Sequence, residues 1–151
     1  VLDRAVLLGR ATQAQRMVAL LDPQAGRCAA DLVTRLEAWP VPVHLRPIHG
    51  DMKLEHAFIS GRKTTLIDME SLSLGDPDYD LAKLDARVTM AQLLGQVTRA
   101  DAEAARLEIR KLAGPGYLWF LTCARLQCAK FFAQRFDRAT IPVMRQVLAE
   151  C

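Results

Sequence analysis

Apolar residues recur at helical spacing over most of this chain. Residues 1–21 and 24–38 each repeat apolar side chains every three or four positions, which predicts two amphipathic helices with one buried face each. Asp22-Pro23 separates the two helices, since proline suits the first position of a new helix, and Pro40 and Pro42 end the second. The positions expected to face inward are Leu2, Val6, Met17, Val18 and Leu21 in the first helix and Cys28, Leu32, Leu36 and Trp39 in the second.

The second half of the chain shows the same spacing and predicts four more helices. We expect them at residues 78–97, 101–113 and 117–136 and after Thr140, which is placed to cap the last one. Residues 117–136 are the most apolar, but charged and amide side chains interrupt them, so a central core helix is favoured over a membrane span. In the first of these helices the inward positions are expected to be Leu81, Leu84, Val88 and Leu94.

The stretch between the two helical halves has a different pattern. Residues 43–48 are expected to be extended, and the β-branched and aromatic runs at 57–59 and 64–67 flank a Ser-Gly-Arg-Lys turn, which predicts a β-hairpin. Residues 69–77 are expected to be irregular. The pattern as a whole predicts a mainly α fold of five or six helices around one small β-hairpin.

Composition narrows the class of protein. The 151 residues are 51% hydrophobic, which is enough for one domain with a substantial core. The formal net charge is only +3 and the basic residues are spread along the helices, which gives no case for a nucleic-acid partner. The sequence shows neither a membrane span nor a signal peptide. The four cysteines form no Cys-x-x-Cys pair, which favours buried free thiols and a cytoplasmic protein.

Residues 49–82 carry the candidate chemistry. The segment reads HGDMKLEH at 49–56, LIDME at 66–70 and GDPDYDLA at 75–82. An acid in a loop, followed by a hairpin and a second acid at the end of a strand, is a layout used for phosphoryl transfer. In that layout one acid handles the acceptor hydroxyl and the other holds a metal ion.

These motifs resemble those of the aminoglycoside phosphotransferase family, which is related to choline kinases and more distantly to protein kinases. The close match covers about residues 44–84, and three motifs in the right order are far more specific than one alone. The resemblance implies the C-terminal, helical lobe of a protein-kinase-like fold. Residues 1–151 would form that lobe, with a catalytic loop at 49–56 and a metal-binding segment at 67–70.

The resemblance also implies roles in catalysis and cofactor binding. Asp51 would be the catalytic aspartate that accepts or orients the proton of the acceptor hydroxyl. Lys53 would contact the transferred phosphate of ATP. Asp68 would bind the Mg²⁺ ions that bridge the nucleotide phosphates, since Mg²⁺ prefers carboxylate and phosphate oxygens.

Other residues of the motifs would support the site. His49 would hydrogen-bond backbone near the metal-binding acid, while Asp76 and Asp80 would brace the loop and cap the following helix. Asp78 occupies a variable position of the family. Glu70 is either a partner of the metal ligands or a solvated loop acid.

His56 departs from the family pattern, because the family has a magnesium-binding Asn at this position. A neutral imidazole is softer than an amide oxygen and a less natural ligand for Mg²⁺. Four interpretations stay open: coordination through a water molecule, a preference for manganese, a weakened metal site, or a histidine that is hydrogen-bonded against the hairpin and binds no metal.

The sequence contains no Gly-rich nucleotide loop and no strand lysine upstream of the motifs. In the related kinases these lie in an N-terminal lobe, so we expect this chain to be a C-terminal lobe that is inactive when isolated. The predicted activity is transfer of the γ-phosphate of ATP to a hydroxyl of a small molecule.

The acceptor is not expected to be an aminoglycoside, because the later helices carry more basic than acidic residues, which does not suit a polycation. A sugar, an amino alcohol or another metabolite fits equally well. One alternative is a non-catalytic, pseudokinase-like binding or regulatory module. Another is a helical protein with an accidental motif match, in which Asp51 and Asp68 would not face one cleft.

Overall fold

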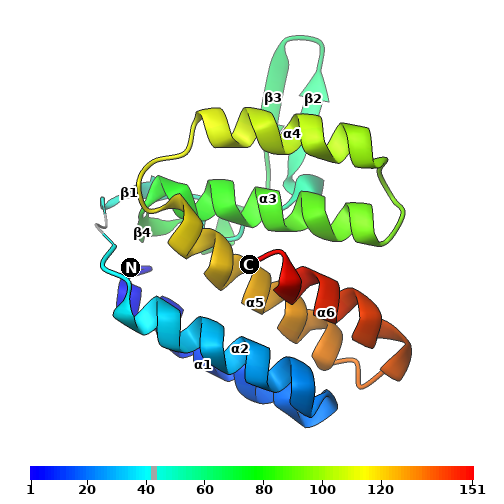
Figure 1. Ribbon diagram of the computed structural model, residues 1–151. Coiled ribbons are helices and arrows are strands. Elements are labelled where there is room, and N and C mark those ends of the chain that lie inside the picture. Colours follow the sequence, from blue (N-terminus) through cyan, green and yellow to red (C-terminus); the bar gives the residue numbers. More distant parts are fainter. Residues whose placement is uncertain (42–43) are drawn as a thin grey trace.

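The computed structural model of the protein describes residues 1–41 and 44–151 and is mainly helical (Figure 1). It confirms the predicted mainly α fold with one small hairpin. The α-helices are α1 (Arg4–Leu21), α2 (Pro23–Ala38), α3 (Pro77–Leu93), α4 (Arg99–Lys111), α5 (Tyr117–Ala133) and α6 (Ile141–Ala149). The strands are β1 (Arg46–Ile48), β2 (Ala57–Ser60), β3 (Lys63–Leu66) and β4 (Ser73–Gly75), and short 3₁₀ turns occur at Leu54–His56, Met69–Ser71 and Arg138–Thr140.

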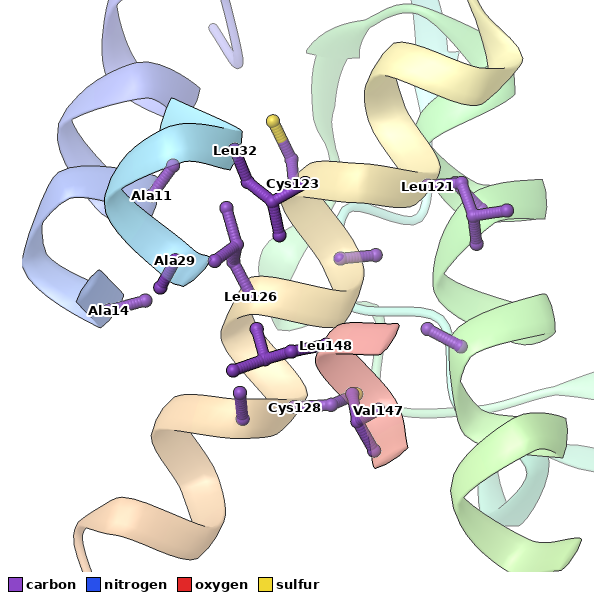
Figure 2. Packing of buried hydrophobic residues seen from close by; sticks show 14 of the residues in the cluster. Ala11, Ala14, Ala29, Leu32, Leu121, Cys123, Leu126, Cys128, Val147 and Leu148 are labelled. Atoms are coloured by element: carbon purple, nitrogen blue, oxygen red, sulfur yellow. The ribbon is translucent and has the colours of Figure 1, made fainter. Parts of the chain in front are cut away.

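Helix α5 forms the centre of the hydrophobic core, as its apolar sequence predicts. It packs against α1, α3 and α6, and its Trp119, Phe120 and Phe132 are almost completely buried. Figure 2 shows Cys123 and Leu126 of α5 beside Leu32 of α2. The large buried side chains of α5 account for its position between the other helices, because burial of apolar area is the main force that stabilises such a core.

Helices α1 and α2 pack through small residues, which corrects the predicted inward faces. Val6 and Cys28 are exposed, whereas Ala11 and Ala14 of α1 are fully buried. A β-carbon on Gly26 of α2 would lie 2.5 Å from that of Ala19 on α1, so the two backbones approach closely. Leu2, Val18, Leu32 and Leu36 are buried as predicted. The prediction was wrong at Val6 and Cys28 because it followed the large apolar residues, while the close contact between these helices requires small ones.

Aspartate side chains begin both helices. Asp3 Oδ1 accepts a hydrogen bond from the Val6 amide (2.9 Å) at the start of α1. Asp22 Oδ1 accepts one from the Gln24 amide (3.0 Å) at the start of α2, where Pro23 takes the first position as predicted. The expected helix stop at Pro42 and the expected start of the extended segment at Val43 lie outside the described residues.

Helix α3 ends four residues before the predicted boundary. Gly95 has a φ of +70°, and the Gln96 amide donates to the Ala91 carbonyl, which is the pattern of a Schellman C-cap. The helix therefore stops at Leu93 and leaves Leu94 exposed.

The starts of α4 and α6 also differ from the prediction. Thr98 caps α4 by accepting from the Asp101 amide (3.1 Å). Thr140 does not cap α6 with its side chain, which instead donates to the Asp137 carbonyl (2.6 Å).

The predicted hairpin is present, and a second strand pair accompanies it. β2 and β3 pair antiparallel with Ala57 opposite Leu66, and in Figure 1 the hairpin projects from the helical body. β1 pairs antiparallel with β4, and Ile48 lies opposite Ser73. Residues 69–77, which were expected to be irregular, thus contain the short strand β4. Its pairing with β1 fixes the position at which the Asp51 loop begins.

The structure bears on two further expectations, that the cysteines are buried free thiols and that no helix spans a membrane. Cys123 and Cys128 are buried and free as expected, but Cys28 is exposed. Among residues 1–41 and 44–151, no helix has both the length and the apolar character needed to cross a membrane.

Candidate active site

The loop that follows β1 turns sharply at Gly50. This residue has a φ of +80°, and a β-carbon there would overlap the Ser71 carbonyl oxygen. Only glycine adopts such a conformation without strain, and here the lack of a side chain also makes room for the neighbouring backbone. Gly50 thereby allows the sharp turn that leads from β1 to Asp51.

Asp80, in the first turn of α3, holds this loop in place. Its Oδ2 accepts a hydrogen bond from the His49 amide (2.7 Å) and its Oδ1 accepts one from the Gly50 amide (2.9 Å). Hydrogen bonds to a charged carboxylate are stronger than neutral ones. The bracing contact that the resemblance implies for Asp80 is therefore the contact that the structure contains.

Two further aspartates at the start of α3 bind other segments. Asp76 caps α3 by accepting from the Asp78 amide (3.0 Å), and its second oxygen accepts from the His44 amide (2.8 Å). Asp78 is buried and accepts from the Gly114 amide (2.7 Å). The alternating acids of the GDPDYD motif therefore tie three separate parts of the backbone to one helix start.

Asp51 lies between two lysine side chains. Lys53 Nζ is 2.5 Å from its Oδ2 and Lys83 Nζ is 2.6 Å from its Oδ1. Partial burial acts to raise the pKa of Asp51, but the hydrogen bonds from the two lysines outweigh it and hold the pKa below its ordinary value. The Asp51 carboxylate is therefore ionised at neutral pH.

Sequence reasoning identified Lys53 but missed Lys83. Lys83 lies on α3 three residues after Asp80, so both side chains project from the same face of the helix. Because Asp80 was expected to support the Asp51 loop, this spacing was the available signal that Lys83 would reach the same loop.

Two histidines connect the loop to the second motif. His49 Nε2 donates to the Ile67 carbonyl (2.9 Å), one residue before Asp68. The rings of His49 and His56 stack with their centroids 5.3 Å apart, and His56 Nε2 lies 3.0 Å from Asp68 Oδ2. Since carbonyl and carboxylate oxygens only accept, both imidazoles carry a hydrogen on Nε2 in this arrangement.

Of His56 and Asp68, Asp68 has the side chain that suits a magnesium ion. Its side chain is 45% exposed, and its backbone adopts the left-handed conformation (φ 62°) that ends the second hairpin arm. Magnesium in nucleotide sites needs only one or two carboxylates, because phosphates and water supply the other ligands. The part of the chain that the structure describes contains no group of three or more His, Cys, Asp or Glu side chains able to hold a metal without such help.

His56 contacts the expected metal-binding acid rather than an open coordination position. While its Nε2 donates to Asp68, that nitrogen has no lone pair for a metal. This geometry favours the interpretation in which His56 is hydrogen-bonded and orients the carboxylate. Glu70 is exposed.

Asp51 faces a cavity of about 490 Å³, which lies between the loop, α1 and α3. Its wall includes Arg10 of α1, Ser73 of β4 and Lys83 of α3. Asp68 is not among the lining residues, so this cavity is not the common cleft that was expected to separate a kinase from an accidental motif match. The histidine pair connects the two acids through the loop instead.

The comparison with known families covers the whole of this site. The profile of the phosphotransferase enzyme family (APH) matches residues 2–114, about three quarters of the chain. The match begins at Leu2, ends at Gly114 and includes all three motifs, in agreement with the resemblance seen in the sequence. Searches of curated proteins and of solved structures give no significant match. The chain belongs to the phosphotransferase enzyme family.

Proposed function

We propose that this chain forms the acceptor and metal side of a kinase that transfers the γ-phosphate of ATP to a hydroxyl of a small molecule. The observation that carries the proposal is the setting of Asp51. Its ionised carboxylate lies beside a cavity, on a loop held by both oxygens of Asp80. A carboxylate held rigidly next to a small-molecule cavity is suited to bind and orient an alcohol.

In this proposal Asp51 orients the acceptor hydroxyl and accepts its proton. Phosphoryl transfer passes through a loose transition state, so the hydroxyl needs alignment more than strong deprotonation. The lowered pKa of Asp51 agrees with such a role, because a weak base orients the alcohol and takes the proton late. Lys53, whose Nζ lies 2.5 Å from Asp51 Oδ2, would contact the negatively charged phosphoryl group as it is transferred to the acceptor.

Asp68 would hold the magnesium ion. His56 fixes the Asp68 carboxylate, and His49 fixes the backbone directly before it. When bound, Mg²⁺ neutralises charge on the nucleotide phosphates. The residues of this chain supply the orientation of that carboxylate relative to the Asp51 loop.

The remaining nucleotide contacts are assigned to an N-terminal kinase lobe. The sequence itself contains no Gly-rich loop that would cover the phosphates. Phe58, Ile59 and Leu66 of the hairpin are exposed, and an apolar face of this kind suits packing against another lobe. Without that lobe the chain is expected to bind ATP weakly and to be inactive.

The test uses the protein as its gene encodes it, with ATP, Mg²⁺ and a panel of alcohols. Replacing Asp51 with Asn should lower the rate of ATP-dependent phosphorylation about 10²–10⁴-fold, the usual contribution of a positioned acid or base. Asp31→Asn, an exposed acid on α2, is the matched control and should keep the rate. Equal rates for Asp51→Asn and the unchanged protein would refute the proposal and favour the pseudokinase-like alternative.

A further inference from the structure

We infer, building on the proposed function, that the acceptor is an alcohol that carries an anionic group, a carboxylate or a phosphate, which Arg10 and Lys83 bind in the cavity beside Asp51. The cavity lies between α1, α3 and the Asp51 loop. Its volume of about 490 Å³ falls within the range typical of small-molecule sites. The acceptor would place its hydroxyl at Asp51 and its charged group on the cationic wall.

Positive charge exceeds negative charge around this cavity. Lys53 and Lys83 each contact a different oxygen of Asp51, so two ammonium groups face one carboxylate. Asp80 also lies nearby, but both of its oxygens accept backbone hydrogen bonds from the loop. Arg10 adds a third cation and forms no ion pair with an acid in the described ranges 1–41 and 44–151. Of the side chains that line the cavity itself, Arg10 and Lys83 are cationic and Asp51 is anionic, which leaves its wall net positive.

Tyr79 brings the two proposed anion-binding side chains to the same wall. Arg10 Nη1 lies 3.4 Å from the Tyr79 hydroxyl, and Lys83 Nζ lies 5.9 Å from the centre of the Tyr79 ring. Burial raises the pKa of Tyr79, so its hydroxyl stays neutral and does not cancel the charge of Arg10. Arg10 and Lys83 therefore converge on one buried ring. The charge of Arg10 is available to a ligand, while Lys83 also pairs with Asp51.

Ser73 provides an independent sign of a polar ligand. Ser73 lines the same cavity, and its Oγ is buried and has no hydrogen-bond partner within the described part of the chain. A buried hydroxyl without a partner is unfavourable unless a ligand or water satisfies it. A carboxylate or phosphate oxygen in the cavity would accept a hydrogen bond from Ser73.

The same charges disfavour a cationic acceptor. A polyamine sugar or a quaternary ammonium alcohol would place its positive charge against Arg10 and Lys83, and like charges in contact at a binding site are repulsive. The site therefore separates anionic alcohols from cationic ones by charge.

Four small probes that differ in charge test the inference on this chain without ATP. Glycerate carries a carboxylate, glycerol 3-phosphate a phosphate, glycerol no charge and choline a positive charge. We expect saturable shifts of the Gly50, Ser73 and Lys83 amide signals in nuclear magnetic resonance spectra with the two anions and none with glycerol or choline. The anion that binds with the lower dissociation constant identifies the anionic group that the site prefers.

Variants assign the binding to the proposed side chains. Arg10→Gln and Lys83→Gln should each weaken anion binding about tenfold or more, since a hydrogen bond to a charged group contributes that much. Arg16→Gln, an exposed position on the same helix as Arg10, is the matched control and should bind the anions as the unchanged protein does. Arg10 is itself exposed, so Arg10→Gln is expected to fold even if Lys83→Gln disturbs the Asp51 loop.

Equal binding of all four probes, binding of choline alone, or unchanged anion binding in Arg10→Gln and Lys83→Gln would overturn the inference. Because these measurements need no turnover, their outcome is separate from that of the proposed function. Asp51-dependent phosphorylation of a cationic alcohol, without binding of either anion, would keep the kinase and refute the anion site. Anion binding that depends on Arg10 and Lys83 would support the site even where Asp51→Asn leaves the phosphorylation rate unchanged.

Discussion

The helical core and the site segment, residues 44–80, are stabilised in opposite ways. In the core, α5 buries Trp119 and Phe120 among apolar neighbours. In the site segment both hairpin strands are largely exposed, and hydrogen bonds to the aspartates at the start of α3 fix the loops. Loss of the hydrogen bonds made by these aspartates should therefore loosen the site segment more than the core, because the site segment has little apolar burial to hold it.

Truncation of Trp119 is the largest expected effect on the core. Trp119 is 1% exposed, and its Nε1 donates to the Leu36 carbonyl (3.0 Å). Trp119→Ala should lower the free energy of unfolding by about 3–5 kcal/mol, measured by urea denaturation. Leu118→Ala, at an exposed position next to it, should stay within about 0.5 kcal/mol. Similar losses for the two variants would contradict a core centred on this face of α5.

Removal of the Asp80 carboxylate should act on the site while sparing the core. Asp80→Ala removes both acceptors of the His49 and Gly50 amides, and we expect a loss of about 1.5–3 kcal/mol. Hydrogen exchange should quicken at these two amides while α5 keeps its protection. Asp31→Ala on the surface of α2 is the control. Unchanged exchange at Gly50 would show that other contacts hold the loop.

Two glycine-to-alanine substitutions, each of which adds one carbon, should have opposite effects in the site segment and in helix α1. Gly50→Ala should cost about 1–3 kcal/mol, because the residue has a φ of +80° and a β-carbon would overlap the Ser71 carbonyl oxygen. Gly9→Ala should raise stability by about 0.5–1 kcal/mol, since Gly9 lies inside α1 with open space around it. Thermal unfolding measures both, and shifts of the same sign would contradict this contrast.

The smallest expected effect is the pH dependence of the Asp22–Arg145 pair, which joins the start of α2 to α6. A hydrogen bond from Arg145 lowers the pKa of Asp22 below its ordinary 3.8. The folded pKa lies below the unfolded one, so the pair stabilises the protein above about pH 4, and this stabilisation is lost as the pH falls through the folded pKa.

Asp22→Asn keeps a good helix cap and removes only the charge. At neutral pH it should cost up to about 1 kcal/mol, because half of the Arg145 side chain is exposed. Urea unfolding at several pH values should show this difference shrinking as the pH falls below the unfolded pKa of about 4. A difference that grows toward low pH would have the wrong sign.

Periodicity in the sequence predicted the helices and the hairpin but not the details that depend on tertiary contact. The close approach of α1 and α2 uses alanines, which a count of large apolar residues overlooks. The pairing of β1 with β4 joins two strands of three residues that lie far apart in the chain, so neither strand carries a pattern long enough to detect. The end of α3 depended on the conformation of one residue, Gly95.

The candidate site was predictable where the chemistry is local to a motif. Asp51, Asp68 and the supporting acids were identified from order and spacing, and the structure places His56 directly on Asp68. The catalytic and metal-binding roles of these residues stay predictions. Arg10 could not be identified from the motifs, because its position beside Asp51 arises from the packing of α1 against the loop. Lys83 was missed although its spacing from Asp80 on α3 was a usable signal.

The aspartates at 76, 78 and 80 have a consequence for the order of folding. Their hydrogen bonds close loops between residues 32, 36 and 31 positions apart, two toward earlier segments and one toward a later segment. Closing loops of this length is entropically slow and is repaid only when the acceptor already stands in place. The Asp51 loop is therefore expected to become ordered together with the first turn of α3 and not before it, because the acceptors of its hydrogen bonds lie on that turn.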